Sequence, residues 1–206
     1  TPPGAYTYTV VGVPPCANDQ ATVTVAVNQA PNAGISSTHL ACSNESAFAL
    51  IDQLGGNPQL NGTWTAPGGG TSTGVFTPGT STPGSYVYTV PGQAPCAAAT
   101  ASVTVVVNPA ANAGTNGSLT LCSTSGATNL FLSLGGSPQL GGTWKKPGNI
   151  PHSGTFQPSI DPPGVYIYTV PGVAPCTTAT ASVTVTVNQT PNAGSNGLVT
   201  ICDNTT

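Results

Sequence analysis

The stretch from Gly164 to Gly194 reads GVYIYTVPGVAPCTTATASVTVTVNQTPNAG. Closely similar stretches begin at Gly84 and at Gly4, so the pattern returns every 80 residues. Two segments in it, GVYIYTV and TATASVTVTVN, alternate between apolar and polar residues, and a Pro- and Gly-rich segment separates them. Such alternation is typical of a β-strand with one buried face. The stretch therefore predicts two strands that close a module repeated along the chain.

The rest of each repeat supplies shorter strands. In the third copy we expect them at 118–122, 128–134, 141–146 and 154–158, with turns rich in Gly and Pro between them. Several short strands at regular spacing predict a β-sandwich. A unit of 80 residues is too long for a solenoid repeat and has the size of a small domain. The expected fold is all-β, with tandem immunoglobulin-like β-sandwich domains that form a rod.

The period also predicts the domain boundaries. Residues 1–34 should hold the last two strands of a truncated Ig-like repeat, 35–114 and 115–194 two whole repeats, and 195–206 the first strand of a following one. The joints, NQAPNAG, NPAANAG and NQTPNAG, are short and would be semi-rigid. We expect the same polypeptide to continue at both ends. The alternative is a head-to-tail neighbour, with Cys202 of one chain bonded to Cys16 of the next.

Aromatic residues recur at matching positions of the repeat. An immunoglobulin-like domain buries a Trp on its third strand and carries a Tyr at the start of a late strand. The sequence places two sets of aromatics in those positions, namely Trp64, Tyr86 and Tyr88, and Trp144, Tyr166 and Tyr168. We predict that all six lie in the cores, together with a valine face formed by Val183, Val185 and Val187. The alternative is that an exposed aromatic in each repeat stacks on sugars.

The composition excludes several classes of function. Charged residues make up 3% of the 206 residues, and the basic ones are Lys145 and Lys146. Binding to nucleic acid needs several such residues, so we expect none, and this pair should be a solvated surface feature. No apolar run reaches the ~18 residues of a membrane helix, which predicts no membrane span in this segment.

The sequence contains no evident set of catalytic residues. Glu45, Asp52 and Asp161 lie at different phases of the repeat, and so do His39 and His152. Acid–base catalysis needs such groups together in a cleft, and a metal site needs clustered ligands. We therefore expect no enzyme, no catalytic residues, no cofactor and no metal.

Six cysteines occupy two phases of the repeat. Cys16, Cys96 and Cys176 share one phase, and Cys42, Cys122 and Cys202 share the other. This regularity favours disulfides and an oxidising compartment. Cys42–Cys96 with Cys122–Cys176, or Cys16–Cys42 with Cys96–Cys122, would both fit the period. We predict the first set, because the long last strand should hold Cys96 and Cys122 far apart, while the first and last strands should start at the same end. Cys16 and Cys202 would then pair outside this segment.

The combination of PGxYxYTVxGxxPC, TATASVTVTVN, PNAG and LGGxPQLGGTW resembles a known family over the whole chain. It is similar to the tandem Ig-like and PKD-like repeats of large Bacteroidota cell-surface adhesins, including flavobacterial gliding-motility adhesins of the SprB type. The resemblance implies export by type IX secretion and a long extracellular filament for adhesion or gliding on the bacterial cell surface. The implied partners are neighbouring repeats of the same long chain, surface glycans, or other copies of the filament. A structural segment is the first hypothesis, and an array of glycan-binding modules is the alternative.

Overall fold

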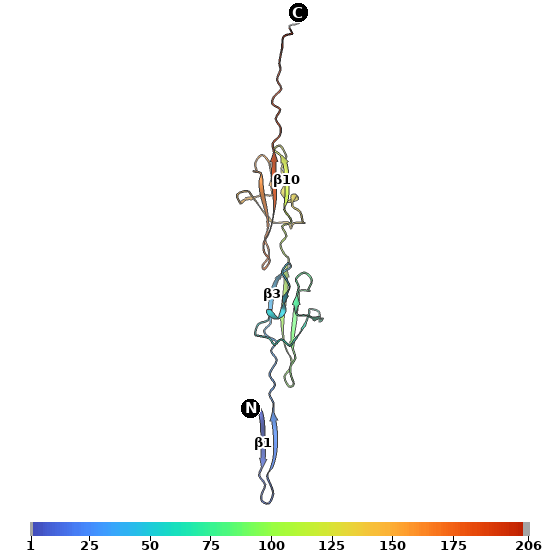
Figure 1. Cartoon of the computed structure of the whole chain (residues 1–206), viewed down its shortest axis with the longest axis vertical. Helices are drawn as coiled ribbons and strands as arrows, with labels where there is room; N and C mark the ends of the chain where they lie inside the picture. Colours follow the sequence, from blue (N-terminus) through green and yellow to red (C-terminus); the bar gives the residue numbers. More distant parts are fainter. Residues whose placement is uncertain (1, 204–206) are drawn as a thin grey trace. The chain divides into compact units, whose positions relative to one another are not determined.

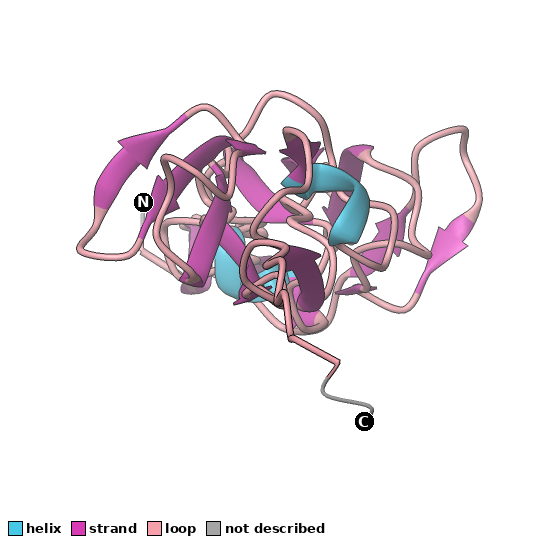
Figure 2. Cartoon of the chain, turned by 90° about the horizontal axis from the view of Figure 1, so that it is seen from above, coloured by secondary structure: helices cyan, strands magenta, loops and turns pink. Residues whose placement is uncertain are grey.

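A computed structural model describes residues 2–203. The chain divides into two compact units, one through Asn108 and one from Pro109 onward (Figure 1). Strands and loops make up nearly all of the described part of both units, and two short 3-10 helices complete it (Figure 2). Among the described residues, no helix is long and apolar enough to cross a membrane.

The second unit is a sandwich of one large and one small sheet. Its five-stranded sheet has the order β10-β16-β15-β12-β13, in which β10 runs parallel to β16 and the other pairs are antiparallel. The small sheet pairs β11 with β14. The elements are β10 (Gly117–Cys122), β11 (Thr128–Asn129), η2 (Leu130–Ser133), β12 (Thr143–Lys146), β13 (Ile150–His152), β14 (Thr155–Phe156), β15 (Gly164–Val170) and β16 (Ala179–Asn188).

The first unit repeats this design and adds a hairpin. Its large sheet has the order β3-β9-β8-β5-β6, its small sheet pairs β4 with β7, and the hairpin pairs β1 with β2. The elements are β1 (Gly4–Val10), β2 (Asp19–Val25), β3 (Ser37–Cys42), β4 (Phe48–Ala49), η1 (Leu50–Gln53), β5 (Thr63–Thr65), β6 (Thr71–Ser72), β7 (Val75–Phe76), β8 (Gly84–Val90) and β9 (Ala99–Asn108). The all-β, Ig-like sandwich fold expected from the sequence is confirmed.

Alternation along the long strands places their apolar residues in the core. In β16, Ala181, Val183 and Val185 are buried, whereas Thr184 and Thr186 are exposed. Side chains of successive strand residues point to opposite faces, so one register buries every second residue.

The six predicted core aromatics are buried in both units. Trp144 packs on Tyr168 with ring centroids 5.0 Å apart, and Trp64 packs on Tyr88 at 4.9 Å. The Tyr166 hydroxyl donates to the Pro162 carbonyl at 2.8 Å, which is the local hydrogen bond of a tyrosine corner. Burial of these rings supplies a large share of each small core.

Two local predictions need correction. The segment 128–134 is a strand only at Thr128–Asn129 and then turns into η2, because the Asn129 side chain accepts from the Phe131 N–H at 2.9 Å and caps the turn. Conversely, Ile150–His152 forms an edge strand inside a predicted turn region. Its Pro151 is tolerated because an edge strand can leave one N–H side unpaired.

The Asn-Ala-Gly segments at 32–34 and 112–114 are each bound to the domain that follows them. The Asn112 side chain donates to the carbonyls of Gly136 and Ser137 at 3.3 and 3.2 Å, and accepts from the Gly114 N–H at 2.8 Å. Its backbone exchanges hydrogen bonds with Gln139. Asn32 repeats this set in the first unit. One set of hydrogen bonds therefore joins the NAG motif of the sequence to the LGGxPQ motif.

Candidate functional site

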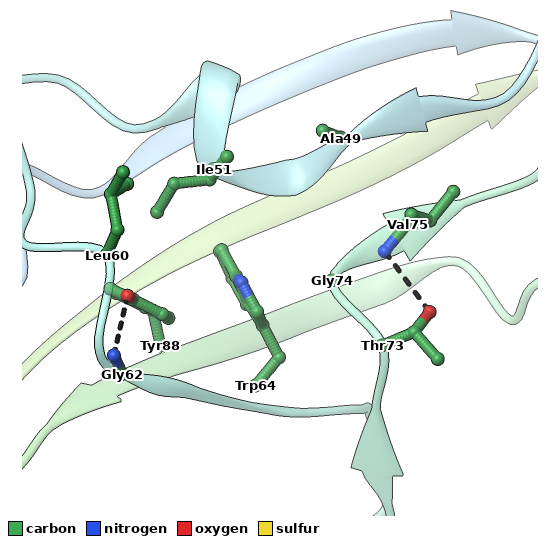
Figure 3. Close-up of a pocket in the computed structure, with 9 residues that line it drawn as sticks. All are labelled: Ala49, Ile51, Leu60, Gly62, Trp64, Thr73, Gly74, Val75 and Tyr88. Atoms are coloured by element: carbon green, nitrogen blue, oxygen red, sulfur yellow. Dashed lines mark hydrogen bonds between the residues drawn. The ribbon is translucent and has the colours of Figure 1, made fainter.

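One candidate for a binding site is an apolar recess in the first unit (Figure 3). Its volume is about 290 Å³, and Trp64, Tyr88 and Ile51 form much of its wall. Tyr88 is fixed there because its hydroxyl accepts from the Gly62 N–H at 2.8 Å and donates to the Gln59 carbonyl at 2.6 Å. The remaining lining residues are Ala49, Leu60, Gly62, Thr73, Gly74 and Val75.

The chemistry of this recess is limited by its lining. None of its lining residues carries a carboxylate, imidazole or ammonium group, so it cannot support acid–base catalysis. Trp64 is only 8% exposed, whereas a sugar-stacking platform needs the face of the ring open to solvent. The recess can accept a small apolar group but does not present its tryptophan.

In the second unit, a different side chain borders the region that corresponds to this recess. Phe131 stands where the first unit has Ile51, and its ring packs edge-on against Tyr168 with centroids 5.4 Å apart and an interplanar angle of 83°. Such T-shaped pairs are favourable beyond their burial. The two repeats therefore differ at the position that borders the recess.

A cluster of titratable side chains lies in the second unit. Asp161 is 9% exposed, and its carboxylate lies 3.3 Å from His152 Nε2 and 3.7 Å from Lys146 Nζ. The same carboxylate accepts from the Gln157 N–H at 3.0 Å. His152 Nδ1 accepts from the Gly154 N–H at 3.0 Å, which leaves Nε2 as the nitrogen that faces Asp161. Lys146 is thus a member of this cluster rather than a purely solvated residue.

Burial and hydrogen bonding act in opposite directions on Asp161. Burial alone would raise the pKa of its carboxyl, but the Gln157 N–H, His152 and Lys146 outweigh it and lower the pKa below the ordinary value. Burial, followed by the charge of Asp161, raises the pKa of Tyr166 to about 12. No cysteine, serine or threonine is hydrogen-bonded to His152 among the interactions of the described residues, so the cluster has the geometry of a buried ion pair.

The first unit holds neutral residues in these positions. Ser81 replaces Asp161 and accepts from the Thr77 N–H at 3.0 Å, and Ser72 replaces His152 and accepts from the Gly74 N–H at 3.2 Å. Ala66 stands at the position of Lys146. In both units, the side chains at these two positions each accept a hydrogen bond from a backbone N–H. The titratable groups belong to the second unit. A comparison of the two repeats at the sequence level could have found this exchange.

The other titratable residues singled out in the sequence form one weaker pair. His39 Nε2 lies 4.0 Å from Glu45 Oε1, and Glu45 Oε2 accepts from the Cys42 N–H at 3.1 Å. Asp52 is exposed in the first turn of η1. No group of three or more His, Cys, Asp or Glu side chains within 2–203 could hold a metal ion.

The cysteines do not form the predicted intradomain pairs. Cys42 and Cys176 are in disulfide form, while Cys16, Cys96, Cys122 and Cys202 are free thiols. Cys42–Cys96 and Cys122–Cys176 are therefore wrong. The reason is the parallel register, which places Cys42 beside Asn108 at the end of β9, whereas Cys96 precedes the start of β9. About nine residues of strand at ~3.3 Å each separate the two ends, far beyond the reach of a disulfide.

Comparisons with known proteins support the fold. The chain matches no protein-family model and no curated protein. Among solved structures, a three-domain immunoglobulin fragment of titin with a Glu-to-Ala change is 15% identical, with a TM-score of 0.51 over 90% of this chain and 75% of that one. An I-band titin fragment gives 13% and 0.47 over 90% and 75%, and four immunoglobulin domains of Sidekick-1 give 12% and 0.44 over 90% and 58%. The likeness at 0.51 establishes that the chain has the fold of tandem immunoglobulin-like domains.

Proposed function

We propose that the chain is a structural repeat segment of a long extracellular cell-surface adhesin or filament. The observation that carries this proposal is the burial of Trp64 and Trp144, which are 8% and 7% exposed and pack on Tyr88 and Tyr168 in the two cores. The aromatic residues that recur in the sequence therefore serve to build each domain. A module whose recurring residues are core residues is suited to extend a chain.

The alternative, an array of glycan-binding modules, finds less support. An array needs an equivalent site in each repeat, with an aromatic face open to the sugar. The recess of the first unit keeps Trp64 inside its wall, and the second unit places the Phe131 ring at the bordering position. Surface glycans remain candidate partners for other faces of the molecule.

The proposed location follows from the cysteines and from the sequence resemblance. Cysteines in disulfide form are typical of oxidising compartments outside the cytosol. The resemblance to Bacteroidota adhesin repeats adds export by type IX secretion, a place on the bacterial cell surface, and a role in adhesion or gliding. Neighbouring repeats of the same long chain and other copies of the filament are the proposed partners.

Immunogold labelling of intact cells tests the proposal. Antibodies raised against residues 35–194 should decorate filaments outside the cell, and mild protease treatment of intact cells should remove the label. Deletion of the gene should reduce attachment to surfaces or gliding. Label found only after cells are permeabilised would overturn the proposed location, and unchanged attachment and motility would overturn the proposed role.

A further inference from the structure

The first and last strands of each sandwich are paired neighbours that run in the same direction. In the second unit, Gly117 at the start of β10 lies opposite Val183. Cys122, at the end of β10, lies opposite Asn188. β3 and β9 pair in the same way in the first unit. Because the chain enters each sandwich through the first strand and leaves through the last, it enters this ladder at one end and leaves it at the other.

This arrangement determines how the ladder responds when the chain is pulled. A pull on the chain before Gly117 and beyond Asn188 draws β10 and β16 past each other along their own axes. The hydrogen bonds of a parallel pair are evenly spaced along the strands, so they share such a shearing force. If the two strands ran antiparallel, the chain would enter and leave at the same end, and the bonds would break one after another from that end.

One further hydrogen bond extends the ladder at each end. At the exit, the Ser123 N–H donates to the Asn188 carbonyl at 2.8 Å. At the entry, the Asn116 side chain accepts from the Ser182 N–H at 2.9 Å. The segment held against β16 is therefore longer than β10 itself.

The first unit makes the same two end bonds, with a different side chain at the entry. The Ser43 N–H donates to the Asn108 carbonyl at 2.9 Å. Ser36 Oγ accepts from the Ser102 N–H at 2.9 Å, and Ser36 stands 80 residues before Asn116. The exchange of serine for asparagine changes the side chain but keeps the bond, so the bond belongs to the repeat rather than to one residue type.

In the second unit, β10 is the strand that a pull would detach. In the part of the chain that the structure describes, β10 pairs with β16 alone, whereas β16 also pairs with β15. Val183 and Val185 of β16 are buried in the core. Leu119 and Leu121 of β10 pack against the same core but are only partly buried. The ladder between β10 and β16 is therefore the contact that resists separation of the chain's entry from its exit.

We propose that this parallel ladder bears the pulling force in each repeat, and that the repeats serve to carry tension along the chain. The inference rests on the proposed function for the source of the tension, because a filament fixed to a cell and attached to a surface is pulled at both ends. The resistance of the ladder is a property of each unit and can be measured without the cell.

Single-molecule force measurements on the full chain test the proposal through the direction of the pull. Azide-bearing residues at Thr115 and Gln189, which are both exposed, attach the handles just outside opposite ends of the ladder. A second version uses Thr115 and the exposed Thr178, which lies just before β16 starts. A reducing buffer opens any disulfide that would limit the extension. At the same constant force, the first version should stay folded about tenfold longer or more, since its ladder bonds break together.

Two variants, pulled at Thr115 and Gln189, separate the ladder from general stability. Asn116→Ala removes the acceptor of the Ser182 N–H and should raise the unfolding rate at constant force about fivefold, the effect of one hydrogen bond. The control is Gly142→Ala, whose added Cβ would lie 2.5 Å from Tyr168 Cζ, away from the ladder. It should lower stability in urea but leave the rate under force within about twofold, because that packing is still intact when the ladder breaks.

The outcomes distinguish this proposal from the proposed function. Equal lifetimes for the two directions of pull would overturn it, and so would an equal acceleration by Asn116→Ala and Gly142→Ala. Either result would leave the extracellular location of the chain standing. Label found only inside cells would overturn that location but would not change the measured lifetimes.

Discussion

Replacement of Asp161 tests whether the charged cluster stabilises the second unit. The change Asp161→Ala removes the acceptor of the Gln157 N–H, leaves Lys146 without its counter-charge and removes the partner of His152 Nε2. A hydrogen bond to a charged group contributes about 1.5–3 kcal/mol, and a broken buried pair adds to the loss. We expect Asp161→Ala to lower the free energy of unfolding by about 2–4 kcal/mol, a large part of the stability of a small domain.

The first unit supplies matched controls for this change. Asp161→Ser keeps the backbone cap, as Ser81 does in the first unit, and should cost about 1–2 kcal/mol because only the charge interactions are lost. The triple change Lys146→Ala, His152→Ser and Asp161→Ser transplants the whole neutral set. It should return the second unit to within about 1 kcal/mol of the parent, since a buried ion pair contributes little beyond a well-packed neutral replacement.

The pH dependence gives a second readout of the same cluster. The folded pKa of Asp161 lies below its unfolded value, about 3.9. Its contribution to stability is therefore present above pH 4 and is lost as pH falls through the lower, folded pKa. The parent should lose stability over this acid range, and the triple variant should lose less.

Urea unfolding followed by tryptophan fluorescence measures both effects. The chain has one tryptophan in each unit, so a Trp64→Phe background leaves Trp144 as the reporter of the second unit. A loss below about 0.5 kcal/mol for Asp161→Ala, or equal acid profiles for the parent and the triple variant, would refute the reasoning.

Three further predictions concern the stability of the second unit. Burial raises the pKa of Tyr166 to about 12. The contribution of this residue to stability is therefore present below the unfolded pKa of ~10 and should be lost as pH rises toward 12. Urea midpoints of the second unit should fall over this range, and they should fall less in Tyr166→Phe. Gly142→Ala should cost about 1–3 kcal/mol, because an added Cβ would lie 2.5 Å from Tyr168 Cζ, and an equal thermal midpoint for this variant would contradict that packing. Asn112→Ala should cost about 1–2 kcal/mol by removing three side-chain hydrogen bonds, and calorimetry should show Asn112→Gln to be no adequate replacement, because the longer side chain cannot keep the same geometry.

Much of the fold can be read from the sequence because each long strand of the repeat carries a period-2 pattern. The valine face of β16 and the aromatic positions of β12 and β15 follow from that alternation and from turn residues alone. The short elements could not be read in the same way. In η2 the deciding interaction is one side-chain cap by Asn129, and in β13 it is edge pairing across a turn, neither of which leaves a periodic pattern.

The candidate sites were less predictable because they depend on the differences between repeats rather than on the repeat itself. The titratable side chains of Lys146, His152 and Asp161 are spread over 16 positions of the sequence, and the pairing of β12 with β13 and the turn before β15 bring them together. Likewise, the exchange of Ile51 for Phe131 appears conservative in sequence, yet it decides whether an aliphatic or an aromatic side chain borders Tyr88 or Tyr168.

The cysteines show why a period alone does not determine connectivity. An 80-residue repeat with two cysteine phases fits several pairings equally well. The decision rests on which end of the last strand each cysteine occupies, and that depends on whether the first strand is parallel and where it stops. β3 and β10 each end at their cysteine, next to the last residue of the long strand, while the other cysteine phase precedes that strand. Within one sandwich the two phases therefore face opposite ends, and the contact of Cys96 with Asn28 directs its thiol toward the end of the preceding hairpin strand.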